Sequence, residues 1–342
     1  MLRKKNFFIY GLVTFALLSI MTLYFGYFLI SPGSNENKET IFIVKKGSGL
    51  KTIAADLRRK GLIKNQSLFI VMAILRGECK NLKAGEYSLN LSMSPVTIFN
   101  VLTSGTIKTY SLTIPEGFTA EQIANTLGKT NLINKNEFAA LVNDKEIAVS
   151  YNIDGQGLEG YLFPDTYLIS RNMEARDLID IMVKHFRRVF KEVTESRKFA
   201  ASQSLSEREV VTLASIVEKE TANPEERPVI ASVFLNRLKR GMRLESDPTV
   251  IYGLEKFNGN LTRRDILTPT QYNTYIIYGL PPGPIANPGR ESLMAVINPT
   301  ITDYLYFVSK NNGSHYFSET LSEHNRAVVK YQKKRRPSST KQ

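Results

Sequence analysis

The stretch Leu213-Ala214-Ser215-Ile216-Val217-Glu218-Lys219-Glu220-Thr221 places a carboxylic acid on the apolar face of a predicted helix. The helix should begin after Ser206, because Ser206 and Glu209 have the spacing of a capping box, in which each residue satisfies an open backbone N–H group of the first turn. Apolar residues then recur at intervals of three and four up to Glu218. Glu220 follows about 200° further round the helix. The pattern therefore predicts that Glu218 continues the apolar face and that Glu220 points elsewhere.

The position of Glu218 makes it a candidate general acid. A carboxyl group among Val, Ile and Ala is poorly solvated, and poor solvation raises its pKa. A raised pKa is what a carboxylic acid needs to donate a proton near neutral pH. The alternative interpretation of this stretch is a glutamate at the rim of a helix, which reaches water or pairs with a nearby arginine.

The composition limits the classes of function. A chain of 342 residues can hold about two domains, and its net charge of +13 favours an anionic partner such as membrane lipid, an acidic polymer or nucleic acid. The single cysteine, Cys79, excludes an internal disulfide framework and a cysteine-based metal cluster. His185, His315 and His324 are widely spaced and form no H-E-x-x-H motif. We therefore expect neither a metal site nor a cofactor.

The N-terminal region has the pattern of a membrane anchor. Phe7–Ile30 is almost wholly apolar, and as a helix it would extend about 36 Å, enough to cross a bilayer with some tilt. The basic residues 3–5 predict that residues 1–6 are cytoplasmic and that the rest of the chain is extracytoplasmic. A cleaved signal peptide is the alternative, but the apolar run is too long for one and no A-x-A site follows it. Residues 31–40 should form a linker, with a flexible stretch at Ser31–Asn35.

Residues 41–107 are expected to form a small module of their own. Ile41–Val44 and Gly85–Leu89 have strand patterns, and helical patterns that start near Leu50 and Gln66 lie between them. This order of strand, helix, helix and strand resembles a LysM module, a small domain that binds glycans containing N-acetylglucosamine. The alternative is an adaptor without a ligand of its own.

Residues 108–332 are expected to form the catalytic domain, followed by a basic tail at residues 333–342. Leu158–Tyr167 combines aromatic residues, which stack on sugar rings, with carboxylates that accept hydrogen bonds from hydroxyl groups. A buried aromatic strand with a Pro-Asp turn is the alternative for this segment. Asn312-Gly313 predicts a hairpin. Because helices and hairpin strands are interspersed without regular βαβ alternation, the predicted fold class is α+β.

Several long segments carry a resemblance to a known family. They are LEGYLFPDTY at 158–167, LASIVEKET at 213–221, ERPVIASVFLNRLKRGMRLESDPTVIYG at 226–253, LTPTQYNTYIIYGLPPGPIANPG at 267–289 and LYFVSKNNGSHYFS at 305–318. Together they resemble the endolytic murein transglycosylases of the YceG-like (MltG) family, from about Ile41 to Tyr331, with the single N-terminal anchor in addition. The resemblance implies that Glu218, in the V-E-K-E run, is the catalytic residue. It also implies cleavage of the MurNAc–GlcNAc bond within peptidoglycan strands, which leaves 1,6-anhydroMurNAc ends and terminates growing strands.

The implied chemistry needs one carboxyl group and no water, metal or cofactor. The glutamic acid protonates the departing glycosidic oxygen, and the resulting carboxylate then deprotonates the C6 hydroxyl of MurNAc, which closes onto its own C1. Peptidoglycan is anionic, which suits a basic chain. The polar and aromatic residues of the matched segments that we expect to line the cleft with Glu218 are Glu159, Tyr161, Asp165, Asn236, Asp247, Tyr252, Asn273 and Tyr275.

Two other functions remain open from the sequence. One is a muramidase hydrolase with two carboxylates, in which Glu159, Asp165 or Asp247 is the second carboxyl group. The other is a non-catalytic, glycan-binding scaffold of the cell-wall synthesis machinery. Nucleic-acid binding has only the net charge in its favour, and an extracytoplasmic location makes it remote. The expected partners are peptidoglycan strands, the cytoplasmic (inner) membrane and peptidoglycan synthases, with the catalytic domain in the periplasmic or extracytoplasmic space.

Overall fold

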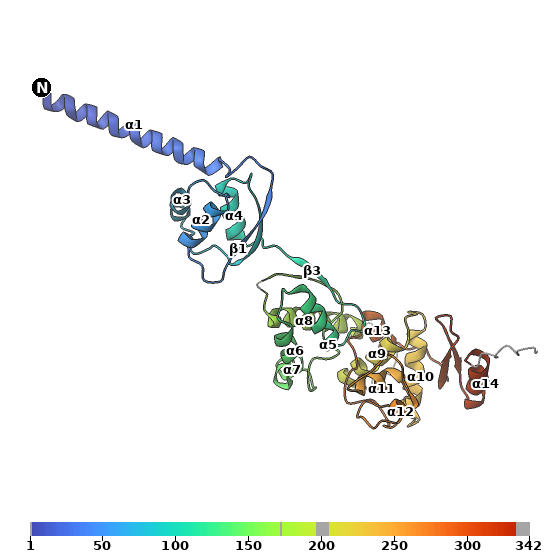
Figure 1. Ribbon diagram of the computed structural model, residues 1–342. Coiled ribbons are helices and arrows are strands. Elements are labelled where there is room, and N and C mark those ends of the chain that lie inside the picture. Colours follow the sequence, from blue (N-terminus) through green and yellow to red (C-terminus); the bar gives the residue numbers. More distant parts are fainter. Residues whose placement is uncertain (1, 172, 196–204, 333–342) are drawn as a thin grey trace, which may run out of the picture. The chain divides into compact units, whose positions relative to one another are not determined.

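The computed structural model describes residues 2–171, 173–195 and 205–332, with side chains from residue 7 onward (Figure 1). The chain divides into two compact units. Unit 1 comprises residues 1–110 with 168–172, and unit 2 comprises residues 111–167 with 173–342. The predicted basic tail, residues 333–342, lies outside the described residues.

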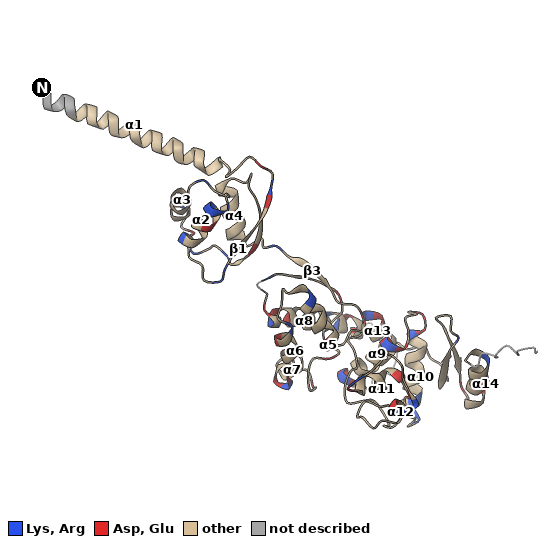
Figure 2. Ribbon diagram, in the orientation of Figure 1, with Lys and Arg blue, Asp and Glu red and all other residues tan. Residues whose placement is uncertain are grey.

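Unit 1 begins with a long helix, α1 (Leu2–Ile30). Its segment Phe7–Ile30 has a mean hydropathy of 2.0 and carries no charged side chain (Figure 2). Within the described residues it is the one helix that is long and apolar enough to cross a membrane. Length and composition are thus consistent with the predicted anchor.

The residues after α1 are packed against unit 1. Ser31 is buried, and the backbone N–H of Ser34 donates a hydrogen bond to the carbonyl of Leu91 over 3.1 Å. Gly33 passes so close to the backbone that a Cβ atom there would lie 2.0 Å from the carbonyl oxygen of Gly61. Residues 31–34 therefore make tertiary contacts although their composition is typical of a loop, and the linker at residues 31–40 stays a prediction.

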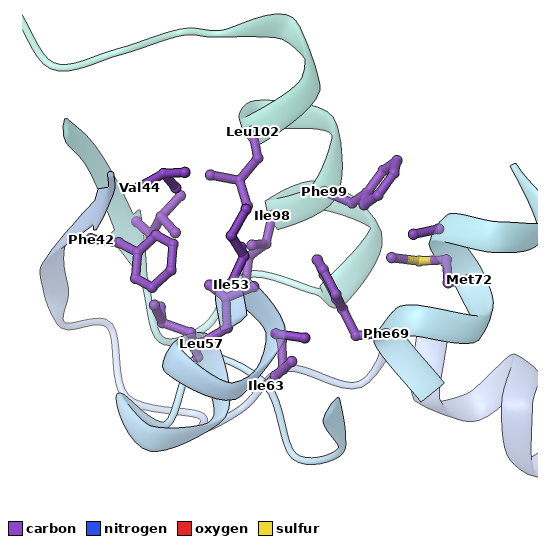
Figure 3. Close-up of a cluster of buried hydrophobic side chains, with 14 of the residues drawn as sticks. Phe42, Val44, Ile53, Leu57, Ile63, Phe69, Met72, Ile98, Phe99 and Leu102 are labelled. Carbon is purple, nitrogen blue, oxygen red and sulfur yellow. The ribbon is translucent and has the colours of Figure 1, made fainter. Parts of the chain in front are cut away.

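The remainder of unit 1 is a two-stranded antiparallel sheet packed against three helices. Strand β1 (Glu39–Val44) pairs with β2 (Gly85–Asn90), and the helices are α2 (Leu50–Arg59), α3 (Gln66–Leu75) and α4 (Pro95–Ser104). Figure 3 shows the core that these elements enclose, which includes Phe42, Ile53, Leu57, Phe69, Met72, Ile98 and Phe99. The order β1, α2, α3, β2 agrees with the predicted strand–helix–helix–strand pattern. The LysM-like character of the unit stays a prediction.

Strands β3 (Tyr110–Thr113) and β4 (Thr166–Ile169) pair with each other and contain the residues at which the chain passes from one unit to the other. Unit 2 is mainly helical, and its strands β5 (Tyr306–Ser309) and β6 (His315–Ser318) form the hairpin predicted at Asn312-Gly313. Its helices are α5 (Ala120–Thr130), α6 (Lys135–Val142), α7 (Lys145–Ser150), α8 (Ala175–Glu195), α9 (Glu207–Glu220), α10 (Arg227–Lys239), α11 (Asp247–Gly253), α12 (Arg263–Ile266), α13 (Arg290–Ile297) and α14 (Leu321–Tyr331). The mixed α+β class is confirmed.

Helix α9 lies at the centre of unit 2 and packs against α10, α11 and α13. Its start is the one predicted, because Ser206 and Glu209 form the complete capping box. Every residue from Val210 to Val217 is buried. The helix is thereby fixed on several sides, and the side chain of Glu218 extends from a rigid element.

Candidate active site

The carboxylate of Glu218 is almost enclosed, with its side chain 5% exposed, and it accepts hydrogen bonds from three donors. The guanidinium of Arg227 binds Oε1 over 3.1 Å. The backbone N–H of Gly289 and the hydroxyl of Ser292 bind Oε2 over 3.0 and 2.7 Å. The expected apolar pocket is therefore not what surrounds this group. Polar donors from distant segments surround it, and a short stretch of sequence cannot reveal them.

Two of these donors come from the beginning of α13. Gly289 is the N-cap of that helix, and Ser292 lies in its first turn. The first N–H groups of a helix have no partner within the helix and carry a partial positive charge, so they favour an anion. The site therefore combines a helix N-terminus and an arginine around one carboxylate.

Glu116, which is not among the candidates predicted from the sequence, is a second carboxyl group at this site. Arg227 lies 3.5 Å from Glu116 and 3.1 Å from Glu218, so one guanidinium bridges two carboxylates. Burial and the neighbouring charge of Glu218 raise the pKa of Glu116, and Arg227 opposes that rise. Glu116 is half-exposed, whereas Glu218 is not. The Pro115-Glu116-Gly117 sequence was the only signal, and it indicates a turn rather than a site.

The turn that carries Glu116 is fixed beside Glu218. The backbone N–H of Gly117 donates to the carbonyl of Asn287 over 2.9 Å, and the ammonium group of Lys219 donates to the carbonyl of Gly117 over 3.2 Å. Gly117 has a φ of +74°, and a Cβ atom there would lie 3.4 Å from Cγ of Glu218. Only glycine adopts this backbone readily, and it allows the turn to approach Glu218 closely.

Glu159, one of the predicted substrate-binding residues, lies in a separate buried network. Its carboxylate accepts hydrogen bonds from the backbone N–H of Ala120, from the side-chain amide of Asn287 and from the hydroxyl of Tyr252. Burial nevertheless raises its pKa to about 7. Asn287 connects this network to the carboxylate pair, because its carbonyl also accepts the hydrogen bond from Gly117. Tyr252, another predicted residue, is thus brought close to Glu159.

Two further predicted residues, Tyr161 and Asp165, lie along α8. The ring of Tyr161 is buried edge-on against Phe186, with 4.9 Å between the ring centroids. Asp165 is half-exposed and lies 3.3 Å from Nδ1 of His185. The contacts that the structure shows for these two side chains connect Leu158–Tyr167 to α8, which agrees with the alternative of a structural aromatic segment.

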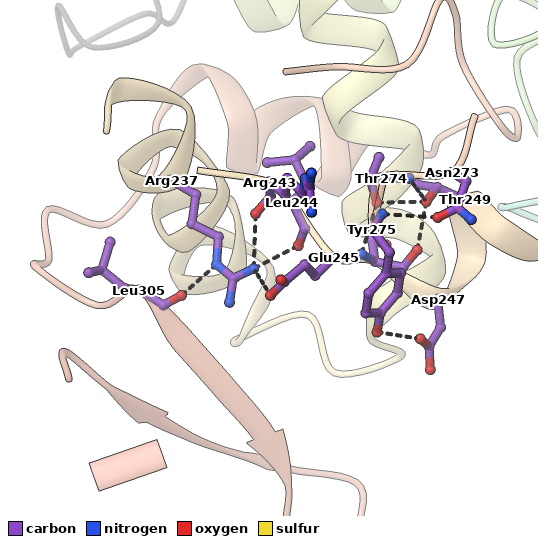
Figure 4. Close-up of polar contacts among 11 residues, drawn as sticks. Arg237, Arg243, Leu244, Glu245, Asp247, Thr249, Asn273, Thr274, Tyr275 and Leu305 are labelled. Carbon is purple, nitrogen blue, oxygen red and sulfur yellow. Dashed lines mark hydrogen bonds and ion pairs between the residues drawn. The ribbon is translucent and has the colours of Figure 1, made fainter. Parts of the chain in front are cut away.

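The four remaining candidates make structural contacts of their own. The amide of Asn236 donates to the carbonyls of Thr302 and Tyr304. Figure 4 shows Asp247 accepting a hydrogen bond from the hydroxyl of Tyr275 over 2.7 Å, with Asn273 nearby. Asn273 is fully buried, and its amide donates to backbone carbonyls. Within the described residues the hydrogen bonds of these four side chains do not involve Glu218, so their place in a substrate cleft stays a prediction.

Glu220 points away from Glu218, as predicted. Its carboxyl group accepts a short hydrogen bond from the hydroxyl of Ser246, immediately before α11. Burial raises its pKa to about 7, and the charge of Asp247 adds to the rise. Across the described part of the chain, no group of three or more His, Cys, Asp or Glu side chains is arranged to hold a metal ion.

The family model described as YceG-like matches residues 42–330, and the chain belongs to that family. A protein of Bacillus subtilis (strain 168) named endolytic murein transglycosylase is 34% identical over 324 residues, which cover 90% of this chain and 89% of that protein. A Streptococcus pneumoniae serotype 2 (strain D39) protein of the same name is 33% identical and matches 96% of this chain, which spans only 65% of that longer protein. The crystal structure of a yceG-like protein from Listeria monocytogenes is 33% identical and covers 85% of this chain and 100% of that one, with a TM-score of 0.58. The resemblance predicted from the sequence is confirmed.

The buried carboxyl groups of Glu159 and Glu220 predict a pH-dependent stability. Their pKa values of about 7 lie above the ordinary value of 4.5, so the unfolded chain releases these protons first. Their contribution is fully present below pH 4.5 and is lost as the pH rises through about 7. As the pH rises from about 5 to about 8, the free energy of unfolding should therefore fall by about 2–3 kcal/mol less for Glu220→Gln than for the wild type.

Urea unfolding of the detergent-solubilised protein at several pH values measures this difference. Glu255→Gln, at an exposed position, is the matched control and should follow the wild type. Equal pH slopes for Glu220→Gln and the wild type would show that the carboxyl group is not held neutral by burial.

Proposed function

We propose that the protein is a membrane-anchored, endolytic lytic transglycosylase of peptidoglycan. It cleaves the MurNAc–GlcNAc bond within nascent glycan strands, leaves 1,6-anhydroMurNAc ends and so terminates elongation. The observation that carries the proposal is Glu218, an enclosed carboxylate on the central helix with three hydrogen-bond donors. Support comes from the relatives of about one third identity, which are named endolytic murein transglycosylases.

In the proposed mechanism Glu218 acts first as an acid and then as a base. The protonated carboxyl group gives its proton to the departing glycosidic oxygen. The carboxylate that results is stabilised by Arg227, Gly289 and Ser292, whose hydrogen bonds to a charged acceptor are stronger than those to a neutral one. The carboxylate then accepts the proton of the C6 hydroxyl of MurNAc as that oxygen closes onto C1, and Glu218 returns to its starting state.

The bridging position of Arg227 gives a second candidate function some support. A glycoside hydrolase needs two carboxyl groups, and Glu116 stands beside Glu218 on the same guanidinium. In that reaction Glu116 would activate a water molecule or stabilise the sugar cation. Glu116 therefore replaces Glu159, Asp165 and Asp247 as the best-placed second carboxyl group. The one-carboxyl reaction remains the leading proposal because of the relatives' names.

The products of cleavage distinguish these reactions. We expect the purified protein to convert un-crosslinked glycan strands into fragments with an anhydro end, which mass spectrometry detects as the loss of one water relative to a reducing end. Reducing ends equal in number to the bonds cleaved would identify a hydrolase. If the wild-type protein cleaves no strands, the non-catalytic scaffold becomes the favoured function.

The proposal also includes the location and the partners. The apolar segment of α1 and the basic residues before it favour a single-pass anchor with the N-terminus in the cytoplasm and the chain after α1 outside. Peptidoglycan strands are then the substrate, and unit 1 is a candidate glycan-binding module. Peptidoglycan synthases are proposed partners because growing strands emerge from them.

A further inference from the structure

The last turns of α1 are part of the core of unit 1. Phe28 is buried in the same cluster as Phe69 and Met72 of α3, and Phe25 and Leu29 pack against that cluster. Helix α1 also contacts α4. Unit 1 is therefore built directly onto the end of the apolar helix, without a mobile segment between them.

The start of α3 is tied to the point where α1 ends. Ser31 is the first residue after α1, and its hydroxyl accepts a hydrogen bond from the ammonium group of Lys64 over 3.0 Å. Asn65 is the N-cap of α3. Figure 1 shows α3 at the end of unit 1 that α1 enters. The start of α3 thus lies next to the end of α1.

The length of α1 determines where its last turn would lie in a membrane. As a helix, Phe7–Ile30 extends about 36 Å, whereas the hydrocarbon core of a bilayer is about 30 Å thick. The last turn of α1 therefore reaches the headgroup region if the segment begins at the opposite face. Elements that contact this turn lie in the headgroup region too.

The outer face of α3 is apolar, which is unusual for a helix on the surface of a water-soluble unit. Val71, Ile74 and Leu75 are 42%, 58% and 72% exposed, and Gln66–Leu75 contains no charged residue. The neighbouring helix α2 has the same length but exposes Lys51, Arg58 and Arg59, so it has the ordinary amphipathic pattern. The difference indicates that α3 faces a medium other than water.

We propose that α3 is a membrane-interfacial helix, with Val71, Ile74 and Leu75 in contact with the lipid at the boundary between headgroups and acyl chains. The inference rests on the proposed membrane anchor. Lys64 and Arg76, at the two ends of α3, add positive charge where anionic headgroups would lie. Unit 1 then rests on the bilayer surface through two elements, α1 and α3.

Lipid contact can be measured on the full-length protein in vesicles of phosphatidylethanolamine and phosphatidylglycerol. A fluorescent bimane group is attached to single cysteines in a Cys79→Ser background, at Leu75→Cys in α3, at Leu18→Cys in α1 and at Ile43→Cys in β1. Ile43 is the matched control because it is another exposed apolar residue of unit 1. We expect nitroxide-labelled lipids to quench the bimane at 75 and at 18, and to leave the bimane at 43 unquenched.

The other results overturn the proposal in different ways. Quenching at 18 with a water-exposed, unquenched bimane at 75 would leave the anchor intact and remove the interfacial helix. A bimane at 75 that is shielded from water but not quenched by lipid would mean that a second copy of the chain covers α3. No quenching at 18 would refute the anchor, and the interfacial helix with it.

Discussion

Glu218→Gln is expected to reduce the rate of glycan-strand cleavage by at least about 10²–10⁴-fold, the usual contribution of general acid–base catalysis. An amide of the same shape cannot give up or accept the proton, and one carboxyl group performs both steps in the proposed reaction. Glycan binding should survive because the amide still forms hydrogen bonds. The rate is measured by release of anhydro-ended fragments from un-crosslinked strands, and binding by co-sedimentation with them.

Glu220→Gln is the matched control for this experiment. Glu220 lies on the same helix but contacts Ser246 rather than the partners of Glu218, so its effect on cleavage should be mild. Circular dichroism and thermal melting check folding, because the amide nitrogen introduced at 218 faces the donors Arg227, Gly289 and Ser292. If Glu218→Gln cleaves strands at a near wild-type rate while Glu220→Gln loses most of its activity, Glu220 and not Glu218 is the catalytic glutamate. If neither change matters, the proposed mechanism is wrong.

Arg227→Met is expected to destabilise the protein by about 3–5 kcal/mol, since removing one partner of a buried ion pair leaves an uncompensated charge. Methionine is apolar and fills part of the same space, but it leaves Glu116 and Glu218 facing each other without the shared cation. The loss should be largest near neutral pH and should shrink in acid as Glu116, whose pKa is raised by burial, takes up a proton. Urea unfolding of the variant and the wild type across this pH range measures it.

Arg227→Lys separates charge from geometry. A lysine keeps the positive charge but lacks the planar guanidinium whose Nη2 lies 3.5 Å from Glu116 and 3.1 Å from Glu218, so we expect intermediate stability and reduced cleavage. Should Arg227→Met unfold within about 0.5 kcal/mol of the wild type, a range typical of surface substitutions, the bridge would have no role in stability. In that case Glu116 and Glu218 would have to be treated as independent groups.

Local features of the chain could be predicted because they depend on neighbouring residues. The capping box of Ser206 and Glu209 and the hairpin at Asn312-Gly313 were confirmed, and so was the opposite orientation of Glu218 and Glu220. Each of these is decided within one or two turns of backbone. The apolar length of Phe7–Ile30 is likewise a property of composition alone. The family could be recognised because the matched segments are long and ordered.

The surroundings of Glu218 were decided by the tertiary structure alone. Gly289 and Ser292 lie 71 and 74 residues further along the chain, and Glu116 reaches the site from a turn in an earlier segment. Residues 31–34 have the composition of a flexible loop, yet contacts with Gly61 and Leu91 hold them in place. Such contacts form only when the chain folds on itself. Periodicity and spacing therefore identified the helix that carries Glu218, but they could not identify the groups that the fold places around this side chain.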